Sequence, residues 1–213
     1  MNSVKVVPSV LSMDFSCIES EMKKLPGSID MLHLDVMDGN FVENITFGPK
    51  VIKTIKKCTD KKLDAHLMIA DPEKYADDFI DAGVSYISFH IETVSDPRKL
   101  IEHISSRGVK PGLAVNPPTD IKTVEPYLPV IDYVLVMSVN PGFAGQSFIS
   151  GVLEKVRYLK KKQDKLNFSI EIDGGINSET AKEAVSAGAQ WLVTGSYFFK
   201  HQNLSEAVRQ LTQ

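Results

Sequence analysis

Two histidines and two aspartates stand at the ends of apolar, strand-like runs. His33 and Asp35 lie two residues apart in the run 29–37, His66 lies in the run 63–69, and Asp173 ends the run 168–173. Side chains alternate between the two faces of a strand, so His33 and Asp35 point the same way, together with Met37. Imidazole nitrogens and carboxylate oxygens are suitable ligands for a divalent transition metal such as zinc, iron, manganese or cobalt.

A structural reading of each residue alone is the commoner one, because polar residues at strand ends often serve as caps or turn residues. Four residues that agree in face and strand end are harder to explain in that way. Burying ionisable groups is costly unless they are paired or bound to a metal. His90 also ends a strand-like run, and its role is left open, whereas His103 and His201 are expected at the surface.

Glycine follows three late strand-like runs. The loop 140–147 contains Gly142 and Gly145, Gly174 and Gly175 follow the next run, and Gly195 follows the last one. Glycine lets backbone N–H groups approach an anion closely, although it also simply permits tight turns. Placed after three neighbouring strands, these loops predict a phosphate site at the same end of the fold as the histidines and aspartates.

Short β-branched runs alternate with amphipathic segments along the whole chain. Eight strands recur about every 25 residues, each followed by a plausible helix, at 4–10, 29–37, 63–69, 84–89, 109–115, 133–139, 168–173 and 191–195. Three helices have clear boundaries: 50–57 after Pro49, 72–81 after the N-cap Asp71, and one that is capped by Asn177 or Ser178 and stopped by Gly188.

This alternation predicts a parallel sheet covered by helices. An open doubly wound sheet and a closed barrel both fit the pattern. The count of eight, and chemically rich residues at nearly every strand end, favour the (β/α)₈ TIM barrel, whose active site lies at the C-terminal ends of its strands. We therefore expect one TIM-barrel catalytic domain over residues 1–213.

The overall composition excludes several classes of partner. With 43% hydrophobic residues, 24% charged residues and a net charge of -3, the chain offers no sign of a nucleic-acid or anionic-membrane surface. No apolar run approaches the roughly 20 residues that span a bilayer. Cys17 and Cys58 make neither a disulfide framework nor a zinc-finger spacing. A strand-like run that begins at residue 4 leaves no room for a signal peptide, so we expect a cytoplasmic protein.

The sequence closely resembles the ribulose-phosphate 3-epimerase family over essentially its whole length. The matching motifs lie at 8–12, 33–39, 44–49, 64–68, 136–143, 171–176 and 194–196. Each motif alone is weak, whereas the set is highly specific. Departures at Glu43, at Ala144 and over 92–96 leave the preferred sugar phosphate open, because loops set specificity.

The resemblance implies metal-dependent epimerisation at C3 of a ketose phosphate, with D-ribulose 5-phosphate and D-xylulose 5-phosphate as the first choice. It implies one divalent ion per subunit, zinc first and iron, manganese or cobalt as alternatives, and a homo-oligomer. Its implied metal ligands are His33, Asp35, His66 and Asp173, of which the two aspartates also exchange protons with the substrate. It implies substrate contacts from Ser9, His66, Gly142, Phe143, Ala144, Gly145, Gly174, Gly175, Gly195 and Ser196. Met37, Met68 and Met137 would line the reacting carbons, unless they are ordinary core methionines.

The sequence bears on three other functions. D-allulose-6-phosphate 3-epimerisation would use the same metal and acid–base residues. Decarboxylation or aldol chemistry on a related phosphate-binding barrel uses an Asp-x-Lys-x-x-Asp motif, but Met37 occupies the lysine position after Asp35. A non-catalytic sensor of a phosphate ligand would have no reason to keep both aspartates beside two histidines.

Overall fold

The computed structural model describes residues 4–143 and 145–213 and contains eight parallel strands. The strands are β1 (Lys5–Pro8), β2 (Met31–Met37), β3 (Lys62–Met68), β4 (Tyr86–His90), β5 (Lys110–Val115), β6 (Tyr133–Met137), β7 (Ser169–Asp173) and β8 (Trp191–Thr194). Their hydrogen-bonded order is β1-β8-β7-β6-β5-β4-β3-β2. The two ends of this sheet meet at a parallel bridge between Ser9 and His33, which closes the barrel. The predicted TIM barrel is therefore confirmed, and the open sheet is excluded.

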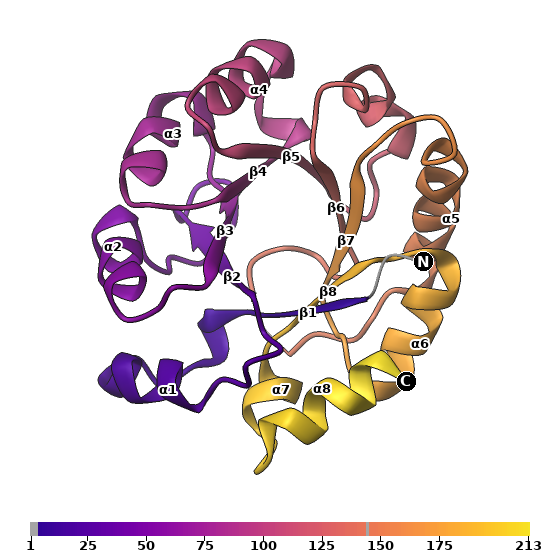
Figure 1. Ribbon diagram of the computed structural model, residues 1–213. Coiled ribbons are helices and arrows are strands. Elements are labelled where there is room, and N and C mark those ends of the chain that lie inside the picture. The colour runs from indigo at the N-terminus through magenta and orange to yellow at the C-terminus, as the bar shows by residue number, and fades with distance from the viewer. Residues whose placement is uncertain (1–3, 144) are drawn as a thin grey trace.

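The helices surround the strands, as the view along the barrel shows (Figure 1). They are α1 (Ile18–Lys24), α2 (Pro49–Lys57), α3 (Pro72–Asp81), α4 (Pro97–Ser106), α5 (Leu153–Lys162), α6 (Ser178–Ala187), α7 (Ser196–Phe199) and α8 (Leu204–Thr212). The predicted caps are present: the Asp71 carboxylate accepts from the backbone N–H of Lys74 at 3.1 Å, and Asn177 forms a capping box with Thr180. Gly188 ends α6 in the left-handed conformation.

The connection after β5 departs from the expected pattern of a helix after each strand. It forms a 3-10 helix at Ile121–Tyr127 that contains Pro126. Proline lacks a backbone N–H, so it cannot donate the hydrogen bond that would extend this turn as an α-helix.

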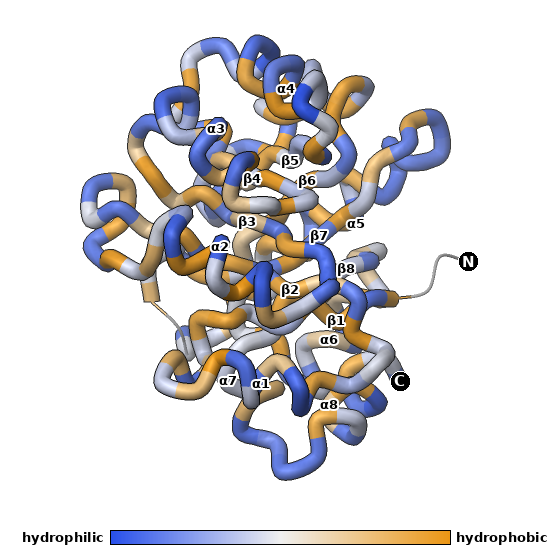
Figure 2. Tube along the Cα trace, turned by 60° about the vertical axis from the view of Figure 1, so that its left-hand side comes forward, coloured by the Kyte–Doolittle hydropathy of each residue, from blue (hydrophilic) through white to orange (hydrophobic). Residues whose placement is uncertain are grey.

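Two layers of buried side chains follow from the alternation along the strands. Leu32, Leu34 and Val36 of β2 belong to the large apolar core between the barrel and its helices. Figure 2 shows the same division, with apolar strand segments inside and hydrophilic segments on the outer helices and loops. Inside the barrel, a second cluster of Met31, Tyr86, Tyr133, Trp191 and two valines fills the N-terminal end of the strands. This apolar cluster therefore lies below the polar residues at the C-terminal ends of the strands.

Candidate metal and substrate site

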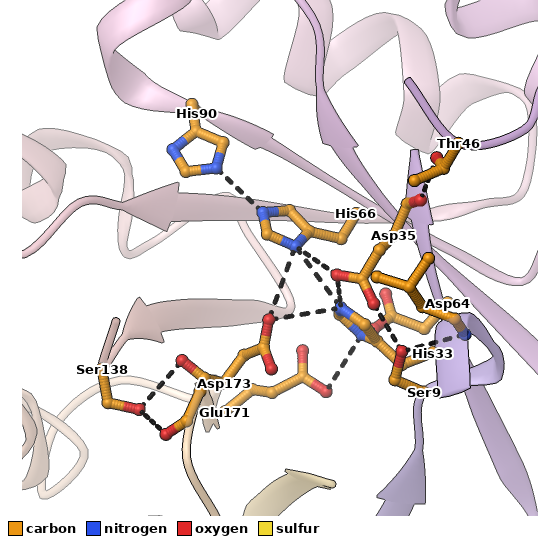
Figure 3. A network of polar contacts seen from close by, with 12 residues as sticks. Ser9, His33, Asp35, Thr46, Asp64, His66, His90, Ser138, Glu171 and Asp173 are labelled. Carbon is orange, nitrogen blue, oxygen red and sulfur yellow. Dashed lines mark hydrogen bonds and ion pairs between the residues drawn. The ribbon is translucent and has the colours of Figure 1, made fainter. Parts of the chain in front are cut away.

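Four donor atoms converge at the C-terminal mouth of the barrel, from strands β2, β3 and β7 (Figure 3). His33 Nε2 lies 3.4 Å from Asp35 Oδ1, 3.4 Å from His66 Nδ1 and 3.9 Å from Asp173 Oδ2. His66 Nδ1 lies 3.5 Å from Asp35 Oδ1 and 3.9 Å from Asp173 Oδ2. The four residues predicted from the sequence as a cluster are thus brought together.

These distances fit a single divalent ion. Four ligands that bind zinc at about 2.0–2.1 Å in a tetrahedron are separated from one another by about 3.4 Å. The measured separations of 3.4–3.9 Å match that spacing with a small expansion. The donor set of two imidazole nitrogens and two carboxylate oxygens also suits zinc, iron, manganese and cobalt.

The electrostatics of the cluster favour a positive charge at its centre. Burial works against a charged His33, yet the carboxylates of Asp35 and Asp64 outweigh burial and raise the pKa of this imidazole well above its ordinary value. In contrast, burial lowers the pKa of His66 to about 4, which leaves this ring a neutral ligand. A proton or a divalent cation between the four donors supplies the charge that the carboxylates attract.

The two aspartates are held in different protonation states. Burial opposes ionisation of Asp35, but the charge and hydrogen bond of His33 prevail and hold the pKa of Asp35 below its usual range. Burial, together with the nearby Asp35 charge, raises the pKa of Asp173 to about 7. An ionised carboxylate therefore lies beside one that carries a proton near neutral pH, which is the pairing that general acid–base chemistry requires.

A set of buried polar residues below the cluster was not singled out from the sequence. The Asp64 carboxylate accepts hydrogen bonds from His33 Nδ1 at 2.7 Å and from the Tyr133 hydroxyl at 2.5 Å. Glu171 lies beside His33 with both carboxylate oxygens buried and without a hydrogen-bond partner among the described residues. The alternation rule contained a signal for both acids, because Asp64 precedes His66 by two residues and Glu171 precedes Asp173 by two.

Asp35 and Asp173 of the cluster line a pocket of about 810 Å³. Such a volume lies in the range of small-molecule sites. The predicted residues that line it are Ser9, Asp35, Met37, Met68, Met137, Gly142, Phe143, Gly145, Asp173, Gly174, Gly175, Gly195 and Ser196. His33 and His66 lie beneath the pocket wall and are fully buried. Ala144, a predicted substrate contact, lies outside the described residues.

The glycine loops meet the same pocket from β6, β7 and β8. Gly142, Gly145, Gly174 and Gly175 adopt positive φ angles of 128°, 79°, 121° and 65°. The loop after β6 is tied down by Gln146, whose side-chain amide donates to the carbonyls of Asn140 and Phe143 at 2.6 and 2.9 Å. These glycines therefore serve the turns and also border the cavity.

The far end of the pocket was not predicted. Lys200, His201 and Asn203, between α7 and α8, line it together with Glu206 of α8. His201, which was expected at the surface, is partly exposed, borders the cavity and packs edge-on against the Tyr197 ring. No periodicity of the strands could indicate this wall, because it comes from α8 and from the segment before it, which lie outside the ring of strands (Figure 1).

Comparison with known proteins identifies a family. The model of the ribulose-phosphate 3-epimerase family matches residues 5–199. The ribulose-phosphate 3-epimerase of Bacillus subtilis is 41% identical over 212 residues, which cover 98% of each chain. That of Synechocystis is 44% identical over 211 residues, which cover 97% of this chain and 92% of the relative.

Solved structures support the fold at greater distance. The 3-hexulose-6-phosphate synthase of Salmonella typhimurium is 20% identical and superposes with a TM-score of 0.70, covering 98% of this chain and 97% of that one. The orotidine 5'-phosphate decarboxylase of Pyrococcus horikoshii is 17% identical with the same TM-score and covers 97% of each chain. Likenesses at this level of identity concern the barrel alone.

Proposed function

Because the chain belongs to the ribulose-phosphate 3-epimerase family and is by that kinship an isomerase, we propose that it interconverts D-ribulose 5-phosphate and D-xylulose 5-phosphate. The observation that carries this proposal is the convergence of two histidines with two aspartates that line a small-molecule pocket. Both the substrate and the reaction fit a site that joins acid–base carboxylates to glycine loops suited to a phosphate.

Inverting C3 of a 2-ketose requires that a proton leave one face of the carbon and that another arrive on the opposite face. In this scheme Asp35 and Asp173 are the two proton-exchanging groups, one acting as base while the other acts as acid. In the metal-free protein the pKa of Asp35 is lowered and that of Asp173 is raised to about 7. In the reverse direction the two carboxyl groups exchange roles.

His33, Asp35, His66 and Asp173 would hold one divalent ion, with zinc as the first candidate and iron, manganese or cobalt as alternatives. When bound, such an ion supplies Lewis-acid stabilisation of the negative charge that develops as the C3 proton leaves. Met37, Met68 and Met137 line the pocket beside the cluster and give this part of it an apolar wall. Ser9 is proposed to contact the substrate from the same wall.

The phosphate of the substrate is assigned to the loops after β6, β7 and β8. Gly142, Gly145, Gly174, Gly175 and Gly195 border the cavity without side chains that would keep an anion from their backbone amides. Phe143 and Ser196 belong to the same wall, and Ala144 is proposed as a further contact by its place in the loop.

A coupled assay with the two aspartate variants tests the proposal. Asp35→Asn and Asp173→Asn should each lower kcat by several orders of magnitude and slow deuterium exchange from solvent into C3. Asp30→Asn, which removes an exposed partner of Lys5, is the matched control and should keep full activity. Near-normal turnover in either site variant overturns the two-carboxylate scheme.

The same assay separates the remaining alternatives. Faster turnover of D-allulose 6-phosphate than of D-ribulose 5-phosphate would reassign the substrate, and ligand binding without turnover of either would indicate a sensor. Removal of metal by a chelator should abolish activity, and zinc, iron, manganese or cobalt should restore it.

We also propose a cytoplasmic homo-oligomer, for which light scattering should give a multiple of 23.6 kDa. Within residues 4–143 and 145–213, no helix is long and apolar enough to cross a membrane.

A further inference from the structure

Behind His66, a line of buried groups runs away from the donor cluster. His66 Nε2 lies 2.9 Å from His90 Nε2, and His90 Nδ1 lies 3.2 Å from Glu92 Oε2 (Figure 3 shows the first of these contacts). Both imidazoles are fully buried, and their rings face each other edge to edge with centroids 5.0 Å apart and planes inclined by 28°. Every ring nitrogen of the two histidines therefore faces a named polar group.

The partners of these nitrogens fix where the protons lie. The Glu92 carboxylate can only accept, so Nδ1 of His90 carries a proton and donates it. A neutral His90 then has a lone pair at Nε2 and accepts a hydrogen bond there. The 2.9 Å contact therefore requires that His66 Nε2 carry a proton and donate it. His66 consequently has its own lone pair at Nδ1, the atom that faces Asp35 and Asp173.

We propose that His90 and Glu92 are positioning residues that hold His66 as its Nε2–H tautomer, with the Nδ1 lone pair aimed at the metal. This inference rests on the proposed metal site. Its counterpart is His33, which donates from Nδ1 to Asp64 and presents Nε2 to the same centre. The two histidine ligands thus use opposite ring nitrogens, and each is oriented by its own carboxylate.

Glu92 is itself held from the opposite side. Its Oε1 accepts from the backbone N–H of Asn116 at 2.9 Å and from the Thr119 hydroxyl at 2.5 Å, which leaves Oε2 for His90. The loop that carries these donors is fixed by Lys155 of α5. The Lys155 ammonium donates to the carbonyls of residues 116, 117 and 119 at 2.7, 2.8 and 2.6 Å. The loop after β5 therefore helps to position His66, through Glu92 and His90.

Zinc titration of the metal-free protein tests the role of Glu92. Glu92→Ala should raise the zinc Kd by roughly ten- to a hundredfold, the range typical for the loss of such an orienting partner. Glu92→Gln should be intermediate, because its amide cannot accept both from His90 and from the two loop donors. Activity of both variants should recover at excess zinc, since the chemistry of the loaded site is left in place. Asp77→Asn breaks the exposed His103–Asp77 pair and should leave the Kd unchanged.

Nitrogen-15 NMR of the zinc-loaded wild-type protein reads the tautomers directly. We expect a metal-bound Nδ1 and a protonated Nε2 on His66, and a protonated Nδ1 on His90. Zinc on His66 Nε2, a proton on His90 Nε2, or an unchanged zinc Kd in Glu92→Ala overturns the inference alone. A wild-type protein that binds none of the candidate metals overturns the proposed metal site together with it.

Discussion

The Ser9 hydroxyl donates to Oδ2 of Asp35 at 2.5 Å, next to the bridge where β1 and β2 close the barrel. The other oxygen of this carboxylate, Oδ1, faces His33 and His66 at 3.4 and 3.5 Å. The two oxygens of Asp35 therefore contact different residues. Closure of the barrel brings Ser9 next to Asp35, where its hydroxyl orients the carboxylate. Ser9 thus acts on the site through Asp35, in addition to the substrate contact proposed for it.

Ser9→Ala should weaken catalysis by leaving Asp35 Oδ2 without its donor. A hydrogen bond to a charged group contributes about 1.5–3 kcal/mol, so kcat/KM should fall by roughly ten- to a hundredfold while the protein remains folded. Steady-state kinetics measures the change. Ser16→Ala, which removes an exposed hydroxyl bonded to Asp14, is the control and should behave as wild type. Equal kinetics for both variants would show that Asp35 needs no such donor.

The raised pKa of Asp173 predicts a pH-dependent stability of the metal-free protein. Burial, followed by the Asp35 charge, raises this pKa from 3.8 to about 7. The unfolded chain then ionises first, so the contribution of Asp173 is complete below pH 3.8 and is lost as pH rises to about 7. Relative to wild type, Asp173→Asn should gain stability over this window, by at most about 1.4 kcal/mol per pH unit, and no further above it. Urea unfolding across pH 4–9 measures the difference, and a gap that does not vary with pH contradicts the prediction.

The buried acid Glu171 should tolerate replacement by its neutral isostere. Burial and the adjacent Asp64 raise the pKa of Glu171 well above its ordinary value, so the fold favours the protonated form of this acid. Because this contribution to stability is complete below the ordinary pKa of 4.5 and is lost as pH rises towards the folded-state pKa, Glu171→Gln should match wild type near pH 4 and exceed it at pH 9. Thermal unfolding at both pH values is the measurement. A variant that is less stable than wild type at pH 9 would show that the carboxylate is ionised in the fold.

The alternation of strand residues, together with the expected closure of the barrel, predicted the donor cluster, and helix caps such as Asp71 and Asn177 gave the helix boundaries. Applied one step earlier along β3 and β7, the same alternation would have included Asp64 and Glu171. The partners within the barrel could not be predicted, because they depend on distances between strands that are far apart in the sequence. His90 illustrates this: its place at a strand end was visible, whereas its contact with His66 required the register of β3 against β4.

The glycine loops make the phosphate assignment testable at one position. Gly174 has a φ of 121°, and a Cβ there would lie 2.5 Å from Val139 Cγ2 and 2.9 Å from the Val139 backbone nitrogen. Gly174→Ala must therefore shift the loops after β6 and β7 against each other, and we expect KM for the sugar phosphate to rise at least tenfold while zinc affinity changes less than threefold. Gly151→Ala is the control, because its Cβ would meet nothing within 4 Å and its φ is not positive. Inorganic phosphate, used as a competitive inhibitor, should lose affinity in parallel with the substrate. An unchanged inhibition constant for phosphate together with a raised KM would place the phosphate elsewhere in the pocket.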